Sequence, residues 1–507
     1  MARFDSILYT HADGLANEPA DCLADLHLDD IIGAIAPGED DTVRVYFYTW
    51  ARDIDEVHYR HEVFQDLSDP NTHRIVQGFV DDIANMRRQL GQSVILFHPL
   101  QRHGWLLHAM STYYRAVIRF DEELAGAKLR SRGLLRLRDY LHAYRHSEQF
   151  VQFMTDTAAM YADVTSIRYA VHINGLHVDV DRYQDQSDYS QQVADLFERF
   201  RRDGGHDYRT RVPDYADMNH VEEQILTCVA QLHPEPFRRL AAHCERYGAR
   251  IDHTLDRFDR EIRFYLTYLE FTQRYTGAGM RFCYPMMSEQ FAGVHADDAF
   301  DLALAVKRKQ DDQQLVCNSF ELTEHERILI VTGPNQGGKT TFARIVGQLS
   351  YLAALGCPVP ATHASLMLPD RIFTHFERQE SVASLHGKLD DELVRIHDIL
   401  ADATDRSVIV MNESFSSTAL ADAVQISTEV LQRIIDIGCL AVYVSFLDEL
   451  TRLHPSCVSM VGDVDPTDPS VRTFHFTRRP ADGLAYANAL AQKYGLTPET
   501  LSRRLTR

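Results

Sequence analysis

The chain has 507 residues, of which 45% are hydrophobic and 25% charged, a balance typical of globular proteins that excludes wholesale disorder. Asp and Glu number 73 against 52 Lys and Arg, so the net charge of −21 argues against a protein coated in nucleic acid, although a local basic surface remains compatible with it. At roughly 150 residues per domain, the length predicts about three domains.

The first half of the sequence has a helical pattern. Apolar residues recur at three- and four-residue spacing, with few internal Gly or Pro, in residues 76–90, 134–161, 189–202 and 236–275. Gly277 and Gly279 form a natural stop after the last of these stretches. We therefore predict a mostly α-helical domain over residues 41–285. Residues 1–40 before it have an uncertain role.

The second half has a different pattern. Short β-rich runs alternate with helical stretches, and these runs lie at residues 328–332, 408–411, 440–445 and 471–476. Such alternation predicts an α/β domain with a largely parallel sheet over residues 286–507.

Three features predict a cytoplasmic protein. No apolar run approaches the roughly 18 residues that a membrane-spanning helix needs, so we expect no membrane contact. The first residues include an acid and lack the apolar stretch of a secretory signal. The eight cysteines are scattered without a CxxC pair, which is typical of reduced, buried thiols and not of a disulfide framework or a zinc site.

Two kinds of polar cluster each allow two interpretations. Two basic stretches either contact nucleic acid or, as we favour, lie on solvated helix faces beside acids; they are Lys128, Arg130, Arg132, Arg136, Arg138 and Arg145, and Arg199, Arg201, Arg202, Arg209 and Arg211. A second group either binds a metal or, as we favour, is a solvated polar strand or loop; it consists of His172, His177, Asp179 and Asp181.

The strongest motif is a glycine-rich loop between an apolar strand and an amphipathic helix. Residues 333–341 read Gly-Pro-Asn-Gln-Gly-Gly-Lys-Thr-Thr and fit the pattern G-x-x-x-x-G-K-[ST] of a phosphate-binding loop. Glycines let backbone N–H groups approach phosphate oxygens closely. We expect Lys339 to reach the β- and γ-phosphates and the Thr340 hydroxyl to ligate Mg²⁺. The alternative is a structural glycine-rich turn.

A second polar pair follows an apolar strand about seventy residues later. Residues 407–413 end in Asn412 and Glu413. Glu413 is suited to polarise an attacking water. Asn412 stands where a metal-handling Asp is expected, and an amide brings no negative charge, so we predict weaker Mg²⁺ binding through a water molecule.

These motifs resemble the MutS family of DNA mismatch-repair ATPases. Thr-Gly-Pro-Asn-Gln-Gly-Gly-Lys-Thr-Thr is similar to the family's TGPNMGGKST, and residues 316–320, 368–374, 380–392 and 486–496 resemble further family segments. The resemblance implies an ABC-type P-loop ATPase domain over residues 286–507, with a C-terminal helical dimerisation element. It also implies that residues 41–285 are core and lever helices, with a clamp-like arm near residues 165–235.

The sequence departs from the family pattern in four places. Asn412-Glu413 replaces the family's Asp-Glu pair, Phe415 to Ala419 replace its Gly-Arg-Gly-Thr-Ser signature, and Phe446 stands at its switch histidine. Nothing resembles the N-terminal mismatch-recognition domain, so we do not expect mismatch reading. The resemblance implies that the signature residues of one subunit touch the nucleotide of the other.

The sequence thus predicts an ATP- and Mg²⁺-binding homodimer that couples nucleotide state to binding of structured or branched DNA. Lys339 and Glu413 are the predicted catalytic residues, and Thr340 and Asn412 the predicted Mg²⁺ residues. The predicted nucleotide contacts are Gly333, Pro334, Asn335, Gln336, Gly337, Gly338, Lys339, Thr340, Thr341, Asn412, Ser416, Ser417 and Thr418. The alternative, motivated by Asn412 and Phe446, is an ATP-sensing interaction protein with weak or absent hydrolysis. A small-molecule kinase is disfavoured because the chain shows no separate acceptor-binding lid.

Overall fold

The computed structural model describes residues 4–10, 20–37, 41–175, 177–185, 218–248, 251–277, 279–308, 315–377, 387–468 and 471–481. They fall into two compact units. The helical unit takes its described residues from 4, 70–129 and 135–259, and the sheet unit from 5–69, 130–134 and 260–507. The segments expected from the sequence were 1–40, 41–285 and 286–507. In the structure, the described residues of 5–69 and 260–285 belong to the same unit as the strands of both larger sheets.

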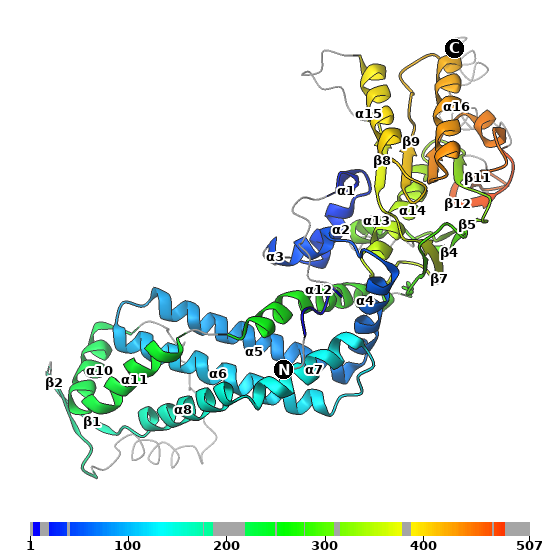
Figure 1. The fold of residues 1–507 in the computed structure, drawn as a ribbon. Coiled ribbons are helices and arrows are strands. Elements are labelled where there is room, and N and C mark those ends of the chain that lie inside the picture. Colours follow the sequence, from blue (N-terminus) through cyan, green and yellow to red (C-terminus); the bar gives the residue numbers. More distant parts are fainter. Residues whose placement is uncertain are drawn as a thin grey trace, which may run out of the picture. The chain divides into compact units, whose positions relative to one another are not determined.

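The helical unit is built on two long helices, α5 (Pro70–Ile95) and α6 (Pro99–Ala125). The three-residue connection between them makes them neighbours along much of their length (Figure 1). Pro99 occupies the first turn of α6, where its missing N–H costs nothing. Phe79 of α5 stacks on Phe120 of α6, with ring centroids 4.3 Å apart.

The remaining elements of the helical unit follow in chain order. They are most of α7 (Arg132–Arg145), α8 (Glu148–Thr165), the antiparallel hairpin β1 (Tyr169–Asn174) and β2 (His177–Arg182), α10 (His220–Leu232), α11 (Pro234–Tyr247) and the first turns of α12 (His253–Thr276). Leu107 and Met110 of α6, Met160 of α8 and Leu240 of α11 belong to one of its buried apolar clusters.

Two predicted helical stretches are divided in the structure. Residues 134–161 form α7 and α8 because the Ser147 hydroxyl caps α8 by accepting from the Phe150 N–H. Residues 236–275 form α11 and α12, and α11 ends at Gly248 with a φ of +54°. Residues 189–202 lie outside the described residues. The predicted arm near 165–235 contains the β1–β2 hairpin and α10 among its described residues.

The main sheet of the described chain has six strands in the order β12-β11-β6-β10-β9-β8. Their bounds are β6 (Ile328–Thr332), β8 (Ile372–Phe376), β9 (Val408–Asn412), β10 (Leu440–Val444), β11 (Cys457–Val464) and β12 (Arg472–Arg478). The five neighbouring strands from β11 to β8 run parallel to one another, and the edge strand β12 pairs antiparallel with β11. The sheet is therefore mixed, with an antiparallel edge strand.

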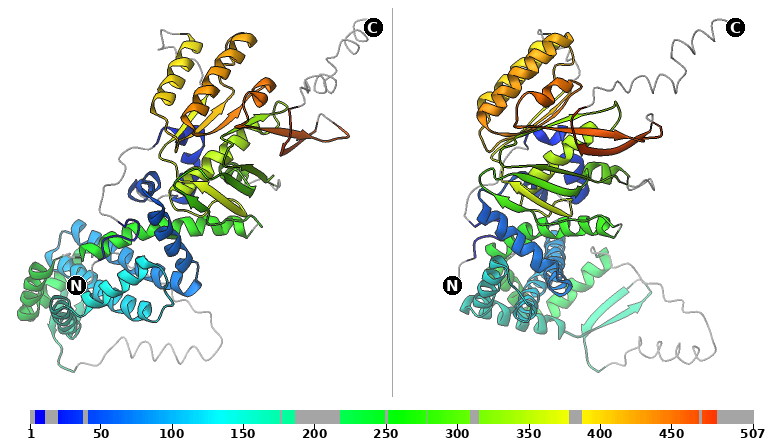
Figure 2. Two further views of the ribbon diagram at one scale, coloured as in Figure 1. Left: turned by 45° about the vertical axis from the view of Figure 1, so that its right-hand side comes forward. Right: turned by 90° about the vertical axis from the view of Figure 1, so that its right-hand side faces the viewer.

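Helices cover this sheet. The helices α15 (Lys388–Asp402) and α16 (Leu420–Ile437) pack on one face through Ile396, Leu431 and Ile434 (Figure 1). Helix α14 (Lys339–Ala354), which is almost wholly buried, contacts both this sheet and a second, four-stranded sheet (Figure 2). The second sheet has the order β3-β7-β4-β5, with bounds Met286–Ser288, His363–Met367, Val294–Ala299 and Asn318–Leu322. Helix α13 (Leu302–Arg308) follows β4.

The N-terminal residues are part of the sheet unit. Helices α1 (Cys22–Asp25) and α2 (Leu28–Ile35) lie against α13, α14 and β8, where Asp25 Oδ2 accepts from the Thr374 hydroxyl at 2.7 Å. Short helices follow at Asp41–Arg44 (α3) and Val45–Tyr48, and then α4 (Ile54–Leu67). The buried Arg60 of α4 donates to the carbonyls of Leu8 and Leu355 at 3.1 and 2.9 Å. These contacts give the described residues around Leu8, Asp25 and Arg60 a structural role.

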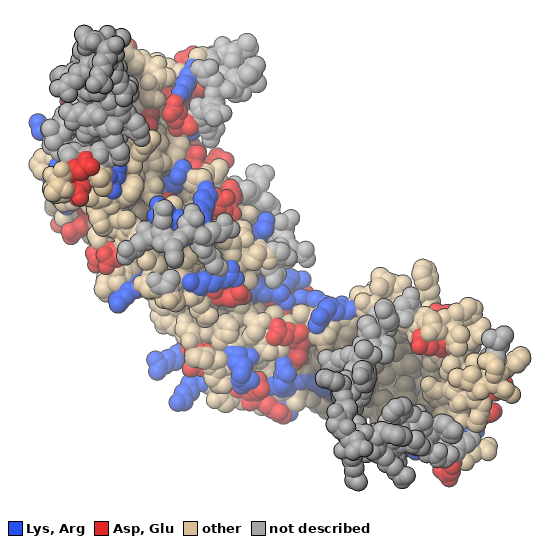
Figure 3. Space-filling view, turned by 180° about the vertical axis from the view of Figure 1, so that it is seen from behind, with Lys and Arg blue, Asp and Glu red and all other residues tan. Residues whose placement is uncertain are grey.

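Charges on the described surface are mostly interspersed. Figure 3 shows one face, on which Lys and Arg side chains alternate with Asp and Glu. In the first predicted basic stretch, Arg132 pairs with Asp55 and Glu62, and Arg138 with Asp139. These pairs agree with the favoured interpretation of that stretch, and the stretch at 199–211 lies outside the described residues. Among the helices that the structure describes, none combines the length and apolarity required to cross a bilayer.

Candidate functional site

The glycine-rich loop connects the carboxyl end of β6 to the first residue of α14, Lys339. Gly333 has a φ of +128° and Gly338 a φ of +89°, conformations that side-chain-bearing residues rarely adopt. A Cβ on Gly333 would lie 2.9 Å from the Gly462 N, and one on Gly337 would lie 2.9 Å from the Pro334 O. The loop therefore requires glycine at these positions.

Lys339 is held inside this loop. It is 5% exposed, and its ammonium donates to the carbonyls of Gly333 and Pro334 at 3.2 and 3.3 Å. The same ammonium lies 4.1 Å from the centroid of the Phe446 ring, a cation–π distance. Burial lowers the pKa of Lys339 below its usual range, and the negative charge of Glu413 opposes that shift. An ammonium in this environment gains from an anionic partner.

Thr340 and Asn412 meet although 72 positions separate them in the chain. The Thr340 hydroxyl donates to Asn412 Oδ1 at 2.8 Å. Asn412 ends β9, where it pairs with Val444 of β10, so the parallel sheet brings the strand end beside the loop. Two oxygen ligands of the kind that Mg²⁺ prefers thus lie together at the start of α14.

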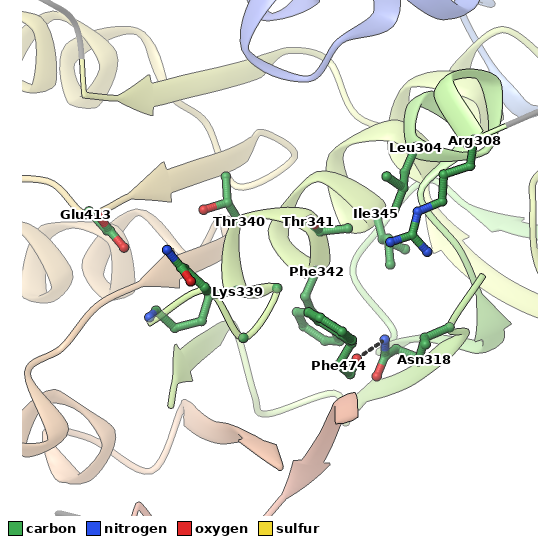
Figure 4. Close-up of a pocket in the computed structure, with 14 residues that line it drawn as sticks. Leu304, Arg308, Asn318, Lys339, Thr340, Thr341, Phe342, Ile345, Glu413 and Phe474 are labelled. Carbon is green, nitrogen blue, oxygen red and sulfur yellow. Dashed lines mark hydrogen bonds between the residues drawn. The ribbon is translucent and has the colours of Figure 1, made fainter. Parts of the chain in front are cut away.

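Glu413 follows in an uncommon backbone conformation. Its φ is +51° and that of Phe415 is +64°, while the Glu413 N–H donates to the Val444 carbonyl at 3.0 Å. Positive φ at two non-glycine residues is costly and persists where surrounding contacts hold it. Here these contacts direct the Glu413 carboxylate into the same cavity as Lys339 (Figure 4).

The cavity has a volume of about 360 Å³, within the range of small-molecule sites. Figure 4 shows Lys339, Thr340 and Glu413 at one end, and Leu304, Arg308, Asn318 and Ile345 at the other. The second end therefore combines apolar side chains, an amide and a guanidinium. Such an arrangement suits a ligand with a phosphate chain at one end and a flat, partly apolar group at the other.

Asn318 organises the second end of the cavity. Its Nδ2 donates to the Phe474 carbonyl at 3.0 Å, and its Oδ1 accepts from the Phe476 N–H at 2.8 Å. The side chain therefore links β5 to the edge strand β12. Val316 and Asn318 belong to residues 316–320, one of the segments that resemble the MutS family, and both line the cavity. The sequence did not indicate Arg308 or Phe474, since neither belongs to a recognisable motif.

Six predicted nucleotide contacts line this cavity, together with the predicted catalytic residue Glu413. The six are Gln336, Gly337, Gly338, Lys339, Thr340 and Thr341. Gly333 and Pro334 accept from Lys339, Asn335 accepts from Arg472 at 3.3 Å, and Asn412 accepts from Thr340. Ser416, Ser417 and Thr418 are outside its lining, in the turn before α16, with both serines exposed. The segments 378–386 and 482–507 lie outside the described residues.

A buried polar network behind Glu413 was not predicted. The His375 Nε2–H donates to the Glu392 carbonyl at 3.1 Å, which leaves His375 Nδ1 to accept from the Ser414 hydroxyl at 2.7 Å. Glu392 Oε2 accepts from the Phe415 N–H at 3.0 Å. The network thus links β8 and α15 to the two residues that follow Glu413. The signal in the sequence was the polar pair Thr374 and His375 inside the otherwise apolar run 372–376.

Burial determines the ionisation of this network. His375 is 1% exposed, and burial lowers its pKa to about 4. Burial also raises the pKa of Glu392, whose Oε1 has no hydrogen-bond partner among the described residues. A neutral His375 is therefore built into the fold at neutral pH, and its tautomer is set by the Glu392 carbonyl.

Comparison with known proteins assigns a family to this region. Residues 329–491 match a family model described as MutS domain V. A DNA mismatch repair protein MutS of Psychrobacter cryohalolentis is 33% identical over 168 residues, covering 33% of this chain and 16% of that protein. A DNA mismatch repair protein MutS of Thermotoga maritima is 28% identical over 194 residues, which cover 38% of this chain and 24% of that protein.

An archaeal relative gives the same result. A DNA mismatch repair protein MutS 2 of Halobacterium salinarum is 30% identical over 184 residues, covering 36% of this chain and 20% of that protein. The chain thus spans about a quarter or less of the length of these relatives. The resemblance to the MutS family that the sequence predicts is confirmed over this C-terminal part.

Proposed function

We propose that this chain, whose residues 329–491 match MutS domain V, is a MutS-type ATPase that couples nucleotide state to DNA binding. The observation that carries the proposal is the hydrogen bond of 2.8 Å between Thr340 and Asn412. It joins the glycine-rich loop to the polar end of β9, directly before Glu413, at a cavity of nucleotide size. A phosphate-binding loop needs this pairing to hold Mg²⁺.

The residues present fit ATP with Mg²⁺. The loop has no room for a Cβ at Gly333 or Gly337, so its backbone can approach phosphate oxygens closely. Lys339 would neutralise the β- and γ-phosphates, and Thr340 with Asn412 would hold Mg²⁺, Asn412 through a water molecule. The ion, when bound, supplies charge neutralisation at the phosphates. Asn318, Leu304 and Arg308 would surround the base and sugar end.

Glu413 is the proposed general base. Its carboxylate would orient and polarise the attacking water, while Lys339 stabilises charge on the phosphoryl oxygens. The positive φ of Glu413 and Phe415 supports this role, because strain of this kind concentrates at sites that need a fixed side-chain direction. The sheet and the His375 network provide the contacts that hold this backbone.

We propose that the active form is a homodimer in which Ser416, Ser417 and Thr418 act on the nucleotide of the other subunit. Two observations support this: the three residues are outside the lining of the chain's own cavity, and both serines are exposed. DNA binding by the helical unit rests on the relatives, whose names describe DNA mismatch repair. We propose structured or branched DNA as the ligand. The eight cysteines, all within the described ranges, form no disulfide, which supports action in the cytoplasm.

A second candidate is an ATP-sensing interaction protein with weak hydrolysis. Asn412 favours it, because an amide brings no negative charge to Mg²⁺. Phe446 favours it as well, because its ring cannot donate a hydrogen bond to a phosphoryl oxygen. The two candidates share nucleotide binding and dimerisation, and differ in turnover.

The test combines solution mass with DNA binding. Light scattering would measure the mass with and without ATP and Mg²⁺, and fluorescence anisotropy would measure binding to four-way-branched and linear DNA. We expect ATP to convert the chain to a dimer, or a loose dimer to a compact one, and to change its affinity for the branched DNA. Lys339→Ala should abolish both responses. If ATP leaves mass and DNA affinity unchanged in the wild-type protein, the proposal is wrong.

A further inference from the structure

Three side chains of metal-ligating type lie together in the helical unit. Asp121 is on α6, and His142 and His146 lie at the end of α7 and just after it. One potential ligand atom from each residue lies within 4.8 Å of the other two. This cluster is separate from the nucleotide cavity and from the β1–β2 hairpin residues considered for a metal in the sequence.

Asp121 is a buried carboxylate in which one oxygen accepts a hydrogen bond and the other does not. Its side chain is 4% exposed, and its Oδ2 accepts from Arg145 Nη1 at 2.9 Å. Its Oδ1 has no hydrogen-bond partner among the described residues and lies 3.5 Å from His142 Nδ1. A buried carboxylate oxygen without a partner is costly. It is therefore a candidate to bind a cation.

His146 is oriented as metal-binding histidines usually are. Its Nδ1 lies 2.8 Å from the His142 backbone carbonyl, which can only accept, so Nδ1 carries the proton. The lone pair is then on Nε2, the atom free to coordinate. An outer hydrogen bond from the other ring nitrogen to a carbonyl is typical of histidine ligands.

The two histidines are spaced to share one ion. They are four positions apart, which places both on one helix face, and their ring centroids are 4.3 Å apart. Both are exposed, so their rings can rotate without disturbing the core. Ligands of a tetrahedral Zn²⁺ stand about 3.4 Å apart for bonds of about 2.1 Å. The ligand atoms of the three residues lie within 4.8 Å of one another, and small rotations of the two exposed rings can shorten this spacing to that of a Zn²⁺ site.

We propose that Asp121, His142 and His146 form a binding site for a divalent transition metal ion of the Zn²⁺ class. Two imidazoles and one carboxylate favour Zn²⁺, Co²⁺ or Ni²⁺ over Mg²⁺ and Ca²⁺, which prefer oxygen ligands. Arg145 need not leave, since it bonds the other Asp121 oxygen and Glu122. The two carboxylates of Asp121 and Glu122 carry two negative charges against the one positive charge of Arg145. The site therefore keeps one negative charge that attracts a cation.

Binding would connect α6 to the end of α7 and stabilise the helical unit by mass action. The metal-free alternative is a simple ion-pair network of Asp121 with Arg145 and His142. The two arrangements differ in one measurable respect, because only the metal site requires the lone pair of His146. The inference does not depend on nucleotide binding.

The test uses the full chain after chelator treatment and dialysis. Calorimetry would measure Zn²⁺ binding, and visible absorption would report the coordination of added Co²⁺. We expect one saturable site with a Zn²⁺ Kd in the micromolar range or tighter, and a Co²⁺ spectrum with intense bands typical of four-coordination. The variant His146→Gln should weaken Zn²⁺ binding at least about tenfold, because loss of even a hydrogen-bond partner of a metal ligand costs about 10–100-fold.

The matched control is His172→Gln with His177→Gln in the exposed β1–β2 hairpin. We expect Zn²⁺ affinity and the Co²⁺ spectrum to stay at their wild-type values in this control. Thermal unfolding without metal would verify that His146→Gln remains folded. The proposal is overturned if wild-type protein binds no Zn²⁺ at micromolar concentration. It is equally overturned if His146→Gln binds as wild type does, or if the hairpin control loses the affinity.

Discussion

The ammonium of Lys339 lies 4.1 Å from the centroid of the Phe446 ring. Lys339 is the first residue of α14, and Phe446 follows β10. The contact therefore joins the end of the glycine-rich loop to the segment after β10. The ring and the carbonyls of Gly333 and Pro334 all contact the ammonium. A phosphate that recruits Lys339 must compete with these contacts.

We predict that Phe446→Leu tightens ATP binding about two- to fivefold. The substitution keeps an apolar side chain but removes the cation–π attraction, which is worth about 0.5–1 kcal/mol at a half-exposed ring. Fluorescent ATP-analogue titration in Mg²⁺ would measure the Kd. Phe97→Leu, at an exposed ring of the helical unit, is the control and should have no effect. Weaker binding in Phe446→Leu would mean that the ring assists the nucleotide instead.

We predict that Asn412→Asp raises the ATPase kcat about tenfold or more. The Thr340 hydroxyl can donate to an Asp at 412 as it does to Asn412 Oδ1. The added negative charge would hold Mg²⁺ more tightly beside the phosphates, a place where electrostatic stabilisation is worth several kcal/mol. Steady-state phosphate release would measure kcat.

Asn71→Asp provides the matched charge control for this experiment, because it adds one negative charge at an exposed position of α5. Its kcat should equal that of the wild-type protein. An unchanged kcat in Asn412→Asp would show that the absent charge does not limit turnover, and would favour a different geometry for the metal.

We predict that His375 makes the sheet unit less stable in acid. Its folded pKa of about 4 is lowered from an ordinary value of about 6.5. As pH falls through this window, the unfolded chain gains a proton that the folded chain does not, so the unfolding free energy falls. The loss between pH 7 and pH 5 is about 2 kcal/mol for this group.

Urea unfolding of wild-type and His375→Gln proteins at pH 7 and pH 5 would test this prediction. The variant should lose less stability over this interval, by about 2 kcal/mol. The raised pKa of Glu392 acts in the opposite direction, and comparing the two proteins largely cancels it. Equal losses in both proteins would show that His375 titrates normally in the fold.

Three strands of the main sheet and the glycine-rich loop could be predicted from short stretches of the sequence. The strand expected at 328–332 is β6, and the runs at 408–411 and 440–445 match β9 and β10 within one residue. The glycine-rich loop leaves no room for a Cβ at Gly333 or Gly337, which agrees with the close backbone approach expected of its glycines. These features follow from short apolar runs and glycine positions, which are readable within a few residues.

Contacts that depend on tertiary packing were not predicted. The His375–Ser414 hydrogen bond joins residues 39 positions apart and exists because β8 and β9 pair in parallel. The packing of α1 on α14 was not predicted either. Leu26 lies so close to Gly347 that a Cβ added to Gly347 would be 2.6 Å from the Leu26 side chain. Neither contact leaves a periodic signal in the sequence, because strand register and helix docking select the partners.

The central claim is that an ATP molecule with Mg²⁺ binds in the glycine-rich loop ahead of Lys339, and calorimetric titration of the protein with ATP and Mg²⁺ tests it most directly. We predict saturable binding at one site per chain. Lys339→Ala should weaken it at least about tenfold, since a charge-assisted hydrogen bond is worth about 1.5–3 kcal/mol. The exposed-lysine control Lys128→Ala should bind as the wild-type protein does. No heat of binding in the wild-type protein, or equal affinity in Lys339→Ala, would contradict the claim.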